Sequence, residues 1–349
     1  MREPFEIGGA AIRPGQRATI DLDVPDLYTH TGITLPVQVI HGKKDGPVLF
    51  LSGALHGDEI NGVEIIRRIL KNKAVKLIRG TLLAVPVVNI YGFINKSRYL
   101  PDRRDLNRSF PGSGTGSLAA RMAHVFLREI VSRCTHGIDL HTATIHRDNL
   151  PHLRALMDDP ETRRIAHAFS LPVILNTRIM EGTLRQAAEQ AGVTVIVYEA
   201  GEALRFDEAS IRGGVKGIIS VMREIGMLPR TGKTAATAYH PLVARSSTWV
   251  RAHQSGILRS RKSLGARVEK GELLGNISDP FGDIDEEVRA PARGIIIGRT
   301  NIPLVNEGEA LFHIAQFSST RAVEGQLEEF RNELNPETDE SRPLEPPII

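Results

Sequence analysis

The sequence predicts an α/β fold: a mixed, mostly parallel sheet with helices on both faces, followed by a smaller all-β domain. Three observations carry this prediction. Short, nearly continuous apolar runs are typical of strands buried on both faces of a sheet. Amphipathic segments of helical period lie between these runs. Near residue 228 the helical pattern gives way to short β-type runs broken by Gly and Pro.

The predicted elements of the α/β part follow one another along the chain. The first 45 residues alternate weakly between apolar and polar side chains, which indicates antiparallel strands at an edge of the sheet. Buried strands are expected at residues 48–51, 80–89, 137–141, 172–175 and 193–198. Helices are expected at residues 61–70, 117–132, 161–169, 182–190 and 211–225.

The chain of 349 residues is long for one compact core, and we expect it to be divided into three parts. An α/β domain is predicted over residues 1–232 and an all-β domain over residues 233–320, where strand and turn patterns repeat between residues 265 and 312. A charged and Pro-rich tail occupies residues 321–349; its start is compatible with a short helix and its end is typical of disorder.

Composition excludes several functional classes. Lys and Arg total 44 against 41 Asp and Glu, and so small an excess argues against a dedicated nucleic-acid-binding protein. No run of about 18 apolar residues occurs, so we expect no membrane span, and the first residues show no signal-peptide pattern. The single cysteine, Cys134, cannot form an internal disulfide, which suits a reducing cytoplasm. These observations are compatible with a homo-oligomer.

Candidate metal ligands lie at the carboxyl ends of two predicted strands. His56 and Glu59 follow the strand at 48–51, and His141 ends the strand at 137–141. Zinc in hydrolases commonly takes two His and one carboxylate and leaves a position open for water. Open α/β sheets bind their ligands at this rim. The alternatives are a loop His followed by an acid at a helix N-terminus, and a core His bonded to a backbone carbonyl.

A candidate catalytic acid, Glu199, follows the predicted strand at 193–198. A carboxylate beside water that a metal activates can take a proton from that water and later give it to a leaving amine. The alternative is a salt bridge at the edge of the sheet.

Residues 98–112 form a polar segment with further candidates. Asp105 can accept a hydrogen bond from a liganded imidazole. Asn107 and Arg108 can bind a substrate carboxylate, which a guanidinium grips with two hydrogen bonds. Arg98 can polarise a scissile carbonyl and stabilise its oxyanion. The alternative is a basic surface loop.

These four segments together, between residues 53 and 201, resemble the succinylglutamate desuccinylase and aspartoacylase family, which is related to the zinc carboxypeptidases. The shared pattern is Gly-x-x-His-Gly-x-Glu, Asp-Leu-Asn-Arg, Asp-Leu-His and Glu-x-Gly, in this order. Two motifs look similar to those of a bacterial branch of this family that includes N-acetyl-diaminobutyrate deacetylases. They are His-Gly-Asp-Glu at 56–59 and Asp-Leu-Asn-Arg-Ser-Phe-Pro-Gly at 105–112.

The resemblance implies a zinc carboxypeptidase-like fold and one zinc ion per chain. It assigns the zinc to His56, Glu59 and His141, the general base and acid to Glu199, the substrate carboxylate to Asn107 and Arg108, and the carbonyl to Arg98. Arg103 and Arg104 compete with Arg98 for this last role, although a surface location suits both of them better. The C-terminal domain has a lipoyl-like pattern without a Met-Lys attachment site, so we expect no carried prosthetic group.

Later basic residues, which family members with acidic acyl groups use, stay unassigned: Arg178, Arg185, Arg205 and Arg212. We expect a zinc-dependent deacylase that hydrolyses the amide of a small N-acyl amino acid of the N-acetyl or N-succinyl type. A zinc carboxypeptidase acting on peptides is the near alternative. A non-catalytic module that binds a small ligand or a protein is the distant one, and such a module has no need of Glu199.

Overall fold

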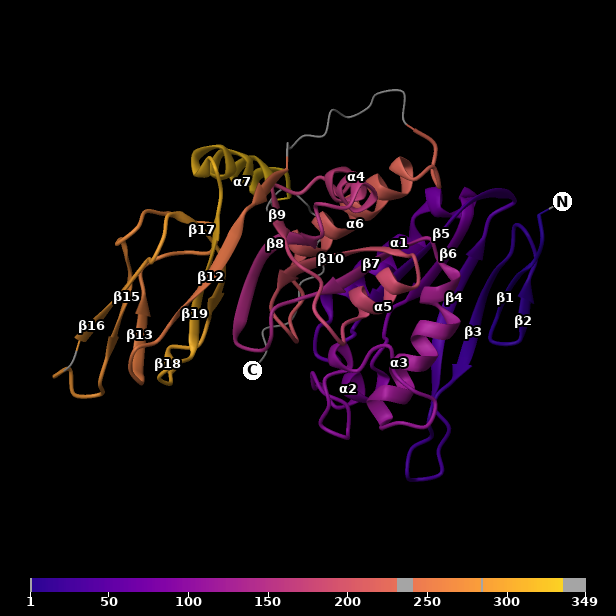
Figure 1. The fold of residues 1–349 in the computed structure, drawn as a ribbon, viewed down its shortest axis with the longest axis horizontal. Helices are drawn as coiled ribbons and strands as arrows, with labels where there is room; N and C mark the ends of the chain where they lie inside the picture. Colours follow the sequence, from indigo (N-terminus) through magenta and orange to yellow (C-terminus); the bar gives the residue numbers. More distant parts are fainter. Residues whose placement is uncertain (1, 231–240, 284, 335–349) are drawn as a thin grey trace.

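The computed structural model describes residues 2–230, 241–283 and 285–334. A mixed sheet runs through the molecule, and Figure 1 shows it extending from the N-terminal strands to the C-terminal strands. Its first part has the strand order β8-β10-β7-β5-β6-β4-β3, with β9 beside β8. These strands are β3 (Arg17–Asp23), β4 (Thr34–His41), β5 (Lys44–Gly53), β6 (Arg79–Val85), β7 (His136–His141), β8 (Arg147–Ala155), β9 (Val173–Asn176) and β10 (Thr194–Gly201).

The predicted parallel arrangement is confirmed at the centre of this sheet. The β6-β5-β7-β10 pairings are all parallel, whereas β8 on one side and β4 and β3 on the other are antiparallel. A separate hairpin is formed by β1 (Phe5–Ile7) and β2 (Ala10–Ile12). The relative direction of the strands therefore follows the sequence pattern. Only continuous apolar runs form the parallel strands at the centre of the sheet.

Helices cover both faces of the sheet (Figure 1). One face carries α1, α4, α6 and α7, and the other carries α2, α3 and α5. The helices are α1 (Asn61–Lys71), α2 (Ile90–Ile94), α3 (Leu118–Glu129), α4 (Pro160–Phe169), α5 (Leu184–Gln190), α6 (Glu208–Glu224) and α7 (Thr320–Leu334), with short 3-10 turns η1 (Lys73–Leu77), η2 (Leu106–Arg108) and η3 (Val131–Arg133). None of the described helices is long and apolar enough to cross a membrane.

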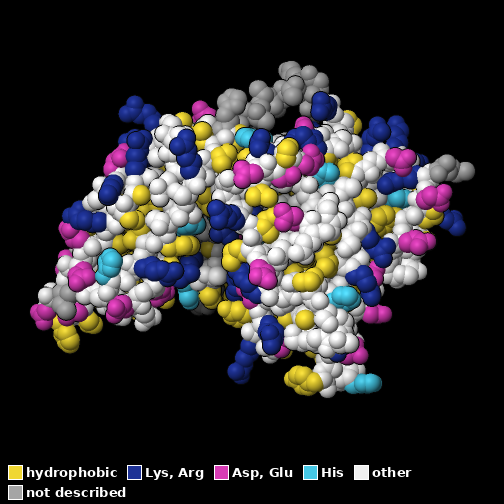
Figure 2. All heavy atoms as spheres, in the orientation of Figure 1, with side chains coloured by type: hydrophobic (Ala, Val, Ile, Leu, Met, Phe, Trp, Pro, Cys, Tyr) yellow, Lys and Arg dark blue, Asp and Glu magenta, His cyan; other side chains and the backbone are white. Residues whose placement is uncertain are grey.

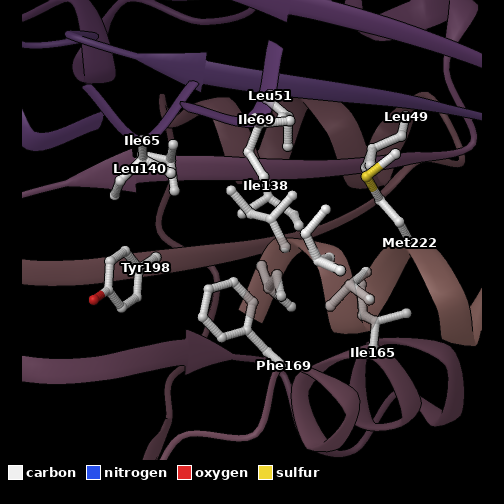
Figure 3. Close-up of a cluster of buried hydrophobic side chains, with 14 of the residues drawn as sticks. Leu49, Leu51, Ile65, Ile69, Ile138, Leu140, Ile165, Phe169, Tyr198 and Met222 are labelled. Atoms are coloured by element: carbon white, nitrogen blue, oxygen red, sulfur yellow. The ribbon is translucent and has the colours of Figure 1, made fainter. Parts of the chain in front are cut away.

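Alternating side chains of the central strands divide between two hydrophobic cores. In β5, Leu49 and Leu51 enter the core beneath α1, α4 and α6, whereas Phe50 enters the core beneath α3 and α5. Figure 3 shows the first of these cores, where Leu49 and Leu51 lie near Ile138 and Met222. Successive strand residues point to opposite faces, so a strand with helices on both sides needs apolar residues throughout.

The C-terminal part is built from strands, as predicted. Its strands are β11 (Leu242–Ala244), β12 (Ser246–Arg251), β13 (Gly256–Ser260), β14 (Arg267–Val268), β15 (Leu273–Ser278), β16 (Asp285–Arg289), β17 (Gly294–Thr300), β18 (Leu304–Val305) and β19 (Ala310–Gln316). Four of them form a separate sheet in the order β16-β15-β13-β18. The strands β12, β19 and β17 instead extend the central sheet, because β17 pairs with β8.

Two strands of the central sheet depart from the predicted ones. Strand β6 ends at Val85 rather than residue 89, since Pro86 has no amide hydrogen with which to continue the ladder. Strand β8 was not predicted, because it carries charged residues and a proline among its apolar ones. The division at residue 232 and the end of the tail lie outside the described residues, so the three-part division stays a prediction. Charged side chains of both signs are spread over the face that Figure 2 shows.

Glycines allow α6 to lie unusually close to its neighbours. A Cβ at Gly217 would lie 2.1 Å from Cε1 of Phe169, and one at Gly214 would lie 2.5 Å from Cδ1 of Ile65. Phe169 in turn stacks on Tyr198 at a centroid distance of 5.3 Å, so the aromatic ring has atoms on both sides. The helix would have to move outward to accommodate a side chain.

We therefore expect Gly217→Ala to lower the free energy of unfolding by about 1–3 kcal/mol, the usual effect of overpacking a core. Gly325→Ala is the matched control: Gly325 lies in α7, and a Cβ added there would have no neighbouring atom within 4 Å. That change should stabilise the helix by roughly 0.5–1 kcal/mol. Urea unfolding followed by circular dichroism measures both. Equal stability of Gly217→Ala and the unmodified protein would contradict the packing argument.

Candidate functional site

The carboxyl ends of three parallel strands align at one edge of the sheet. Gly53 at the end of β5 pairs with Leu140, and His141 at the end of β7 pairs with Glu199 of β10. Neighbouring strands lie about 4.8 Å apart, so Glu199 stands directly beside His141. The loop that follows β5 carries His56 and Glu59 to the same edge.

The three predicted metal ligands come together there. One ligand atom each from His56, Glu59 and His141 lie within 4.8 Å of one another, and all three residues are buried. The Nδ1 atom of His56 is 2.7 Å from Oε1 of Glu59, and Nδ1 of His141 is 2.7 Å from Oε2 of the same carboxylate. The backbone amide of Thr142 also donates to Oε2 of Glu59, over 3.1 Å. Two imidazoles and a carboxylate can thus converge on a single metal ion.

The far nitrogen of each imidazole has a carboxylate partner. The Nε2 atom of His56 is 3.1 Å from Oδ1 of Asp105, as expected from the sequence, and Nε2 of His141 is 2.7 Å from Oδ2 of Asp139. Ser52 donates to the other oxygen of Asp139 over 2.7 Å. Such partners fix a ring with its proton on Nε2 and its lone pair on Nδ1, which a metal requires. Asp139 was not assigned from the sequence, although it lies two residues before His141 on the same strand and such residues share a face.

Charge in the cluster favours a bound cation. Burial would lower the pKa of His141, but the charges of Asp139 and Glu59 outweigh it and raise that pKa well above its usual value. Burial would likewise raise the pKa of Glu59, but His56 and His141 hold it well below its usual range. The carboxylates that attract the protonated imidazoles would also lie beside a bound metal ion. Binding of a metal would release their protons.

Close packing holds the ligand loop in place. A Cβ at Gly57 would lie 2.0 Å from the carbonyl carbon of Gly92 in α2, so only glycine fits. The positive φ of this loop belongs to Ala54, with φ 45°. The buried side chain of Asn61 ties the loop to β10, because its Nδ2 donates to the carbonyl of Ala200 over 3.1 Å.

Glu199 faces the same cavity as the metal ligands. Its Oε2 accepts a hydrogen bond from Nδ2 of Asn149 over 3.1 Å, and its Oε1 lies 3.4 Å from a guanidinium nitrogen of Arg154. Glu199 therefore forms the kind of salt bridge that the alternative interpretation expected, with Arg154 as its partner. Both partners come from β8, the strand that was not predicted, and Glu199 lines the same cavity as His56, Glu59 and His141.

Arg98 lies against the ligands. Its guanidinium donates to Oε1 of Glu59 over 3.1 Å and to Oδ2 of Asp105 over 3.0 Å, and it lines the cavity. Arg103 and Arg104 are exposed and are not among the described residues that line it. Of the three arginines considered from the sequence, Arg98 is the one beside the site.

Asn107 and Arg108 border the cavity from η2. The Oδ1 atom of Asn107 accepts a hydrogen bond from the backbone amide of Leu184, over 2.9 Å. This contact orients the amide group and leaves its Nδ2 as a donor. The guanidinium of Arg108 donates to the carbonyl of Asn107 over 2.6 Å and is largely exposed. Both side chains are thus available to a ligand that enters the cavity.

The cavity has a volume of about 290 Å³ and a strongly cationic wall. Three acids line it, Glu59, Asp139 and Glu199. Six arginines line it as well: Arg98, Arg108, Arg147, Arg154, Arg178 and Arg185. The excess of arginine favours an anionic ligand.

Trp249 of β12 forms part of the same wall. It stacks on His313 at a centroid distance of 4.4 Å, and the guanidinium carbon of Arg147 lies 5.7 Å from its ring centroid. Sequence reasoning left Arg178 and Arg185 unassigned and missed Arg147, Asn149, Arg154 and Trp249. The C-terminal strands therefore contribute directly to the cavity.

The chain is similar to known proteins in sequence and in fold. The Succinylglutamate desuccinylase/Aspartoacylase catalytic domain model matches residues 45–225. The N-alpha-acetyl-L-2,4-diaminobutyric acid deacetylase of Halomonas elongata is 26% identical over 295 residues, which cover 81% of this chain and 86% of that protein.

Solved structures show the same fold. The product-bound ectoine utilization protein EutE (DoeB) of Ruegeria pomeroyi superposes with a TM-score of 0.79 and 25% identity, covering 90% of this chain and 100% of that one. A succinylglutamate desuccinylase/aspartoacylase of Rhodobacter sphaeroides superposes with a TM-score of 0.78 and 24% identity, covering 87% and 96%. Because the matching domain spans more than half of the sequence, the chain belongs to the succinylglutamate desuccinylase/aspartoacylase family.

Proposed function

We propose that the protein is a zinc-dependent deacylase that hydrolyses the amide bond of a small N-acyl amino acid. The observation that carries this proposal is the convergence of His56, Glu59 and His141 beside Glu199 in one cavity. A binding module would need neither the complete ligand set nor an acid placed next to it. The absence of an internal disulfide, with Cys134 as the single cysteine, supports a cytoplasmic location.

The donor set fits one zinc ion per chain. Two imidazole nitrogens and a carboxylate suit zinc, whereas magnesium and calcium prefer sites made of oxygen atoms. Asp105 and Asp139 would orient the two imidazoles through their Nε2 atoms. A bound zinc would polarise the scissile carbonyl and lower the pKa of water towards neutrality.

The protein's own side chains account for the proton transfers and for the developing charge. Glu199 takes a proton from the attacking water and gives it to the amine nitrogen as the C–N bond breaks, so that water and amide become a carboxylic acid and an amine. Asn149 keeps the carboxylate of Glu199 in position by its hydrogen bond to Oε2. Arg98 donates hydrogen bonds to the oxygen of the carbonyl as negative charge builds on it.

The arginines support a substrate with more negative than positive charge. Asn107 and Arg108 are proposed to bind the carboxylate of the amino acid. Burial lowers the pKa of Arg185 to about 10, and the positive charge of Arg154 acts in the same direction. The hydrogen bonds of Arg185 go to neutral groups, the hydroxyl of Thr177 and the carbonyl of Arg178. A second substrate carboxylate would relieve this crowding of like charges.

This charge distinguishes the proposed substrate from that named for the Halomonas elongata relative. Diaminobutyric acid carries an amino group on its side chain, which the arginines would repel. A peptide substrate is also less suitable, because a cavity of about 290 Å³ bounded by Trp249 accommodates a small amide better than an extended chain. We therefore favour an N-acyl amino acid with a second carboxylate, either on the acyl group or on the amino acid.

Asp139→Asn tests the metal site. Asparagine keeps the shape of the Asp139 side chain but removes the charge that accepts the hydrogen bond of His141, so the affinity for zinc should fall roughly 10–100-fold. Competition with a chelator of known affinity measures this. Asp45→Asn is the control, because the side chain of Asp45 is 88% exposed. Unchanged affinity in Asp139→Asn would remove this carboxylate from the metal site.

Glu199→Gln tests catalysis. Glutamine keeps the shape of the side chain but cannot take a proton, so turnover should fall by at least roughly 10²–10⁴-fold while zinc content stays the same. Turnover and zinc are measured on one sample, with the exposed Glu181→Gln as control. Near-normal turnover with full zinc would exclude Glu199 as the base, and lost zinc would make it a ligand.

Arg185→Met tests the substrate class. For N-acyl dicarboxylates such as N-acetylaspartate and N-succinyl amino acids, kcat/KM should fall by the equivalent of a charge-assisted hydrogen bond, about 1.5–3 kcal/mol. N-acetylalanine should be affected much less. The control is Arg205→Met, since Arg205 is exposed and pairs with Glu202. Preference of the unmodified protein for N-acetyl-diaminobutyrate over every dicarboxylate would contradict the anionic class.

A further inference from the structure

A second, larger cavity lies at the opposite edge of the sheet from the catalytic cluster. This groove, of about 960 Å³, is bordered by the beginnings of β5 and β6 and by the segment that follows α6. Its apolar lining consists of Ile40, Leu70, Val75, Leu77, Ile78 and Leu228. Leu77 is 84% exposed, which is unfavourable for a large apolar side chain in water.

The rim of the groove is positively charged. No Asp or Glu is found among the described residues that line it. Six cationic residues line it: Arg17, Lys43, Lys44, Lys76, Arg79 and Arg230. Figure 2 shows Lys and Arg side chains at the upper right, near the end of α6 in Figure 1, with Asp and Glu side chains beside them. The groove therefore suits an occupant that is both acidic and apolar.

We propose that residues 335–349 of the chain bind in this groove. The segment carries four acids and one arginine, so its net charge is −3, opposite to that of the rim. Its acids are Glu337, Asp339, Glu340 and Glu345. Its apolar residues lie towards the end of the segment, with Leu344, Ile348 and Ile349 among several prolines. Charge and apolar surface thus match those of the groove.

The segment starts close enough to reach the groove. Leu334, at the end of α7, packs over Gly213 in α6 and belongs to the same core as Ile40, Ile78 and Leu228. From Gly213 to the end of α6 is about 17 Å of helix, and the groove begins just beyond. Fifteen residues span up to about 50 Å when extended, so the apolar end of the segment can reach Leu77 with length to spare.

Because residues 335–349 belong to the same chain as the groove, a weak interaction is sufficient to hold them there. A short flexible tether gives the segment an effective concentration in the millimolar range. Ion pairs at an exposed rim contribute little individually and are screened by salt, so burial of Leu77 and the two isoleucines would supply much of the binding energy. Binding would join the C-terminal end of the chain to the α/β part and thereby restrain the strands that carry Trp249.

Disulfide trapping in the full-length protein tests this proposal. We combine Leu77→Cys with Ile348→Cys and oxidise at low protein concentration. Cys134 does not compete, because it is buried. The control combines Tyr28→Cys with Ile348→Cys, since Tyr28 is fully exposed in the loop after β3, away from the groove. Non-reducing gels and peptide mapping detect the monomeric cross-link.

The groove pair should form its intramolecular disulfide at least roughly tenfold faster than the control pair. High salt and the double change Lys43→Glu, Lys44→Glu should each slow trapping of the groove pair and leave the control pair unchanged. Equal rates for the two pairs would overturn the proposal. A disulfide between two chains in place of the monomeric one would also overturn it, by making a second copy the occupant. Indifference to both salt and charge reversal would exclude the proposed ion pairing.

Discussion

One buried carboxylate, shared by two imidazoles, organises the site. Glu59 is 1% exposed, and a carboxylate in such a position is tolerated only when charged partners and hydrogen-bond donors surround it. His56, His141, Arg98 and the amide of Thr142 meet this requirement. These partners come from three separate segments, so the requirement is satisfied only when the strand ends, the loop after β5 and the polar segment before η2 are assembled together.

Much of this assembly could be predicted from local sequence. Continuous apolar runs identified the parallel strands, and the residues that end them identified His141 and Glu199. The carboxyl ends of parallel strands lie at the same edge, so a polar residue at the end of each strand is enough to bring distant positions together. Asp105 was predicted for a different reason: an imidazole that binds metal through one nitrogen needs a partner for the other.

The remainder depended on contacts between distant parts of the chain. Strand β8 lies between β10 and β17, and its polar sequence indicates neither neighbour. Arg147, Arg154 and Trp249 could not be assigned to the cavity before that pairing was known. Their charges and rings have no periodic pattern, and their relevance comes only from the place to which a non-local ladder brings them.

The pairing of β8 has a consequence for how this protein can be rearranged. The Asn149 position of β8 pairs with Gly201 on one side and with Gly298 on the other, while its side chain holds Glu199. The C-terminal strands are therefore joined to the acid by a ladder of strand pairs, from β17 through β8 to β10, with a register shift between Glu199 and Gly201. A graft that exchanges them for those of a relative must preserve the register of β17 on β8, or it will displace Asn149.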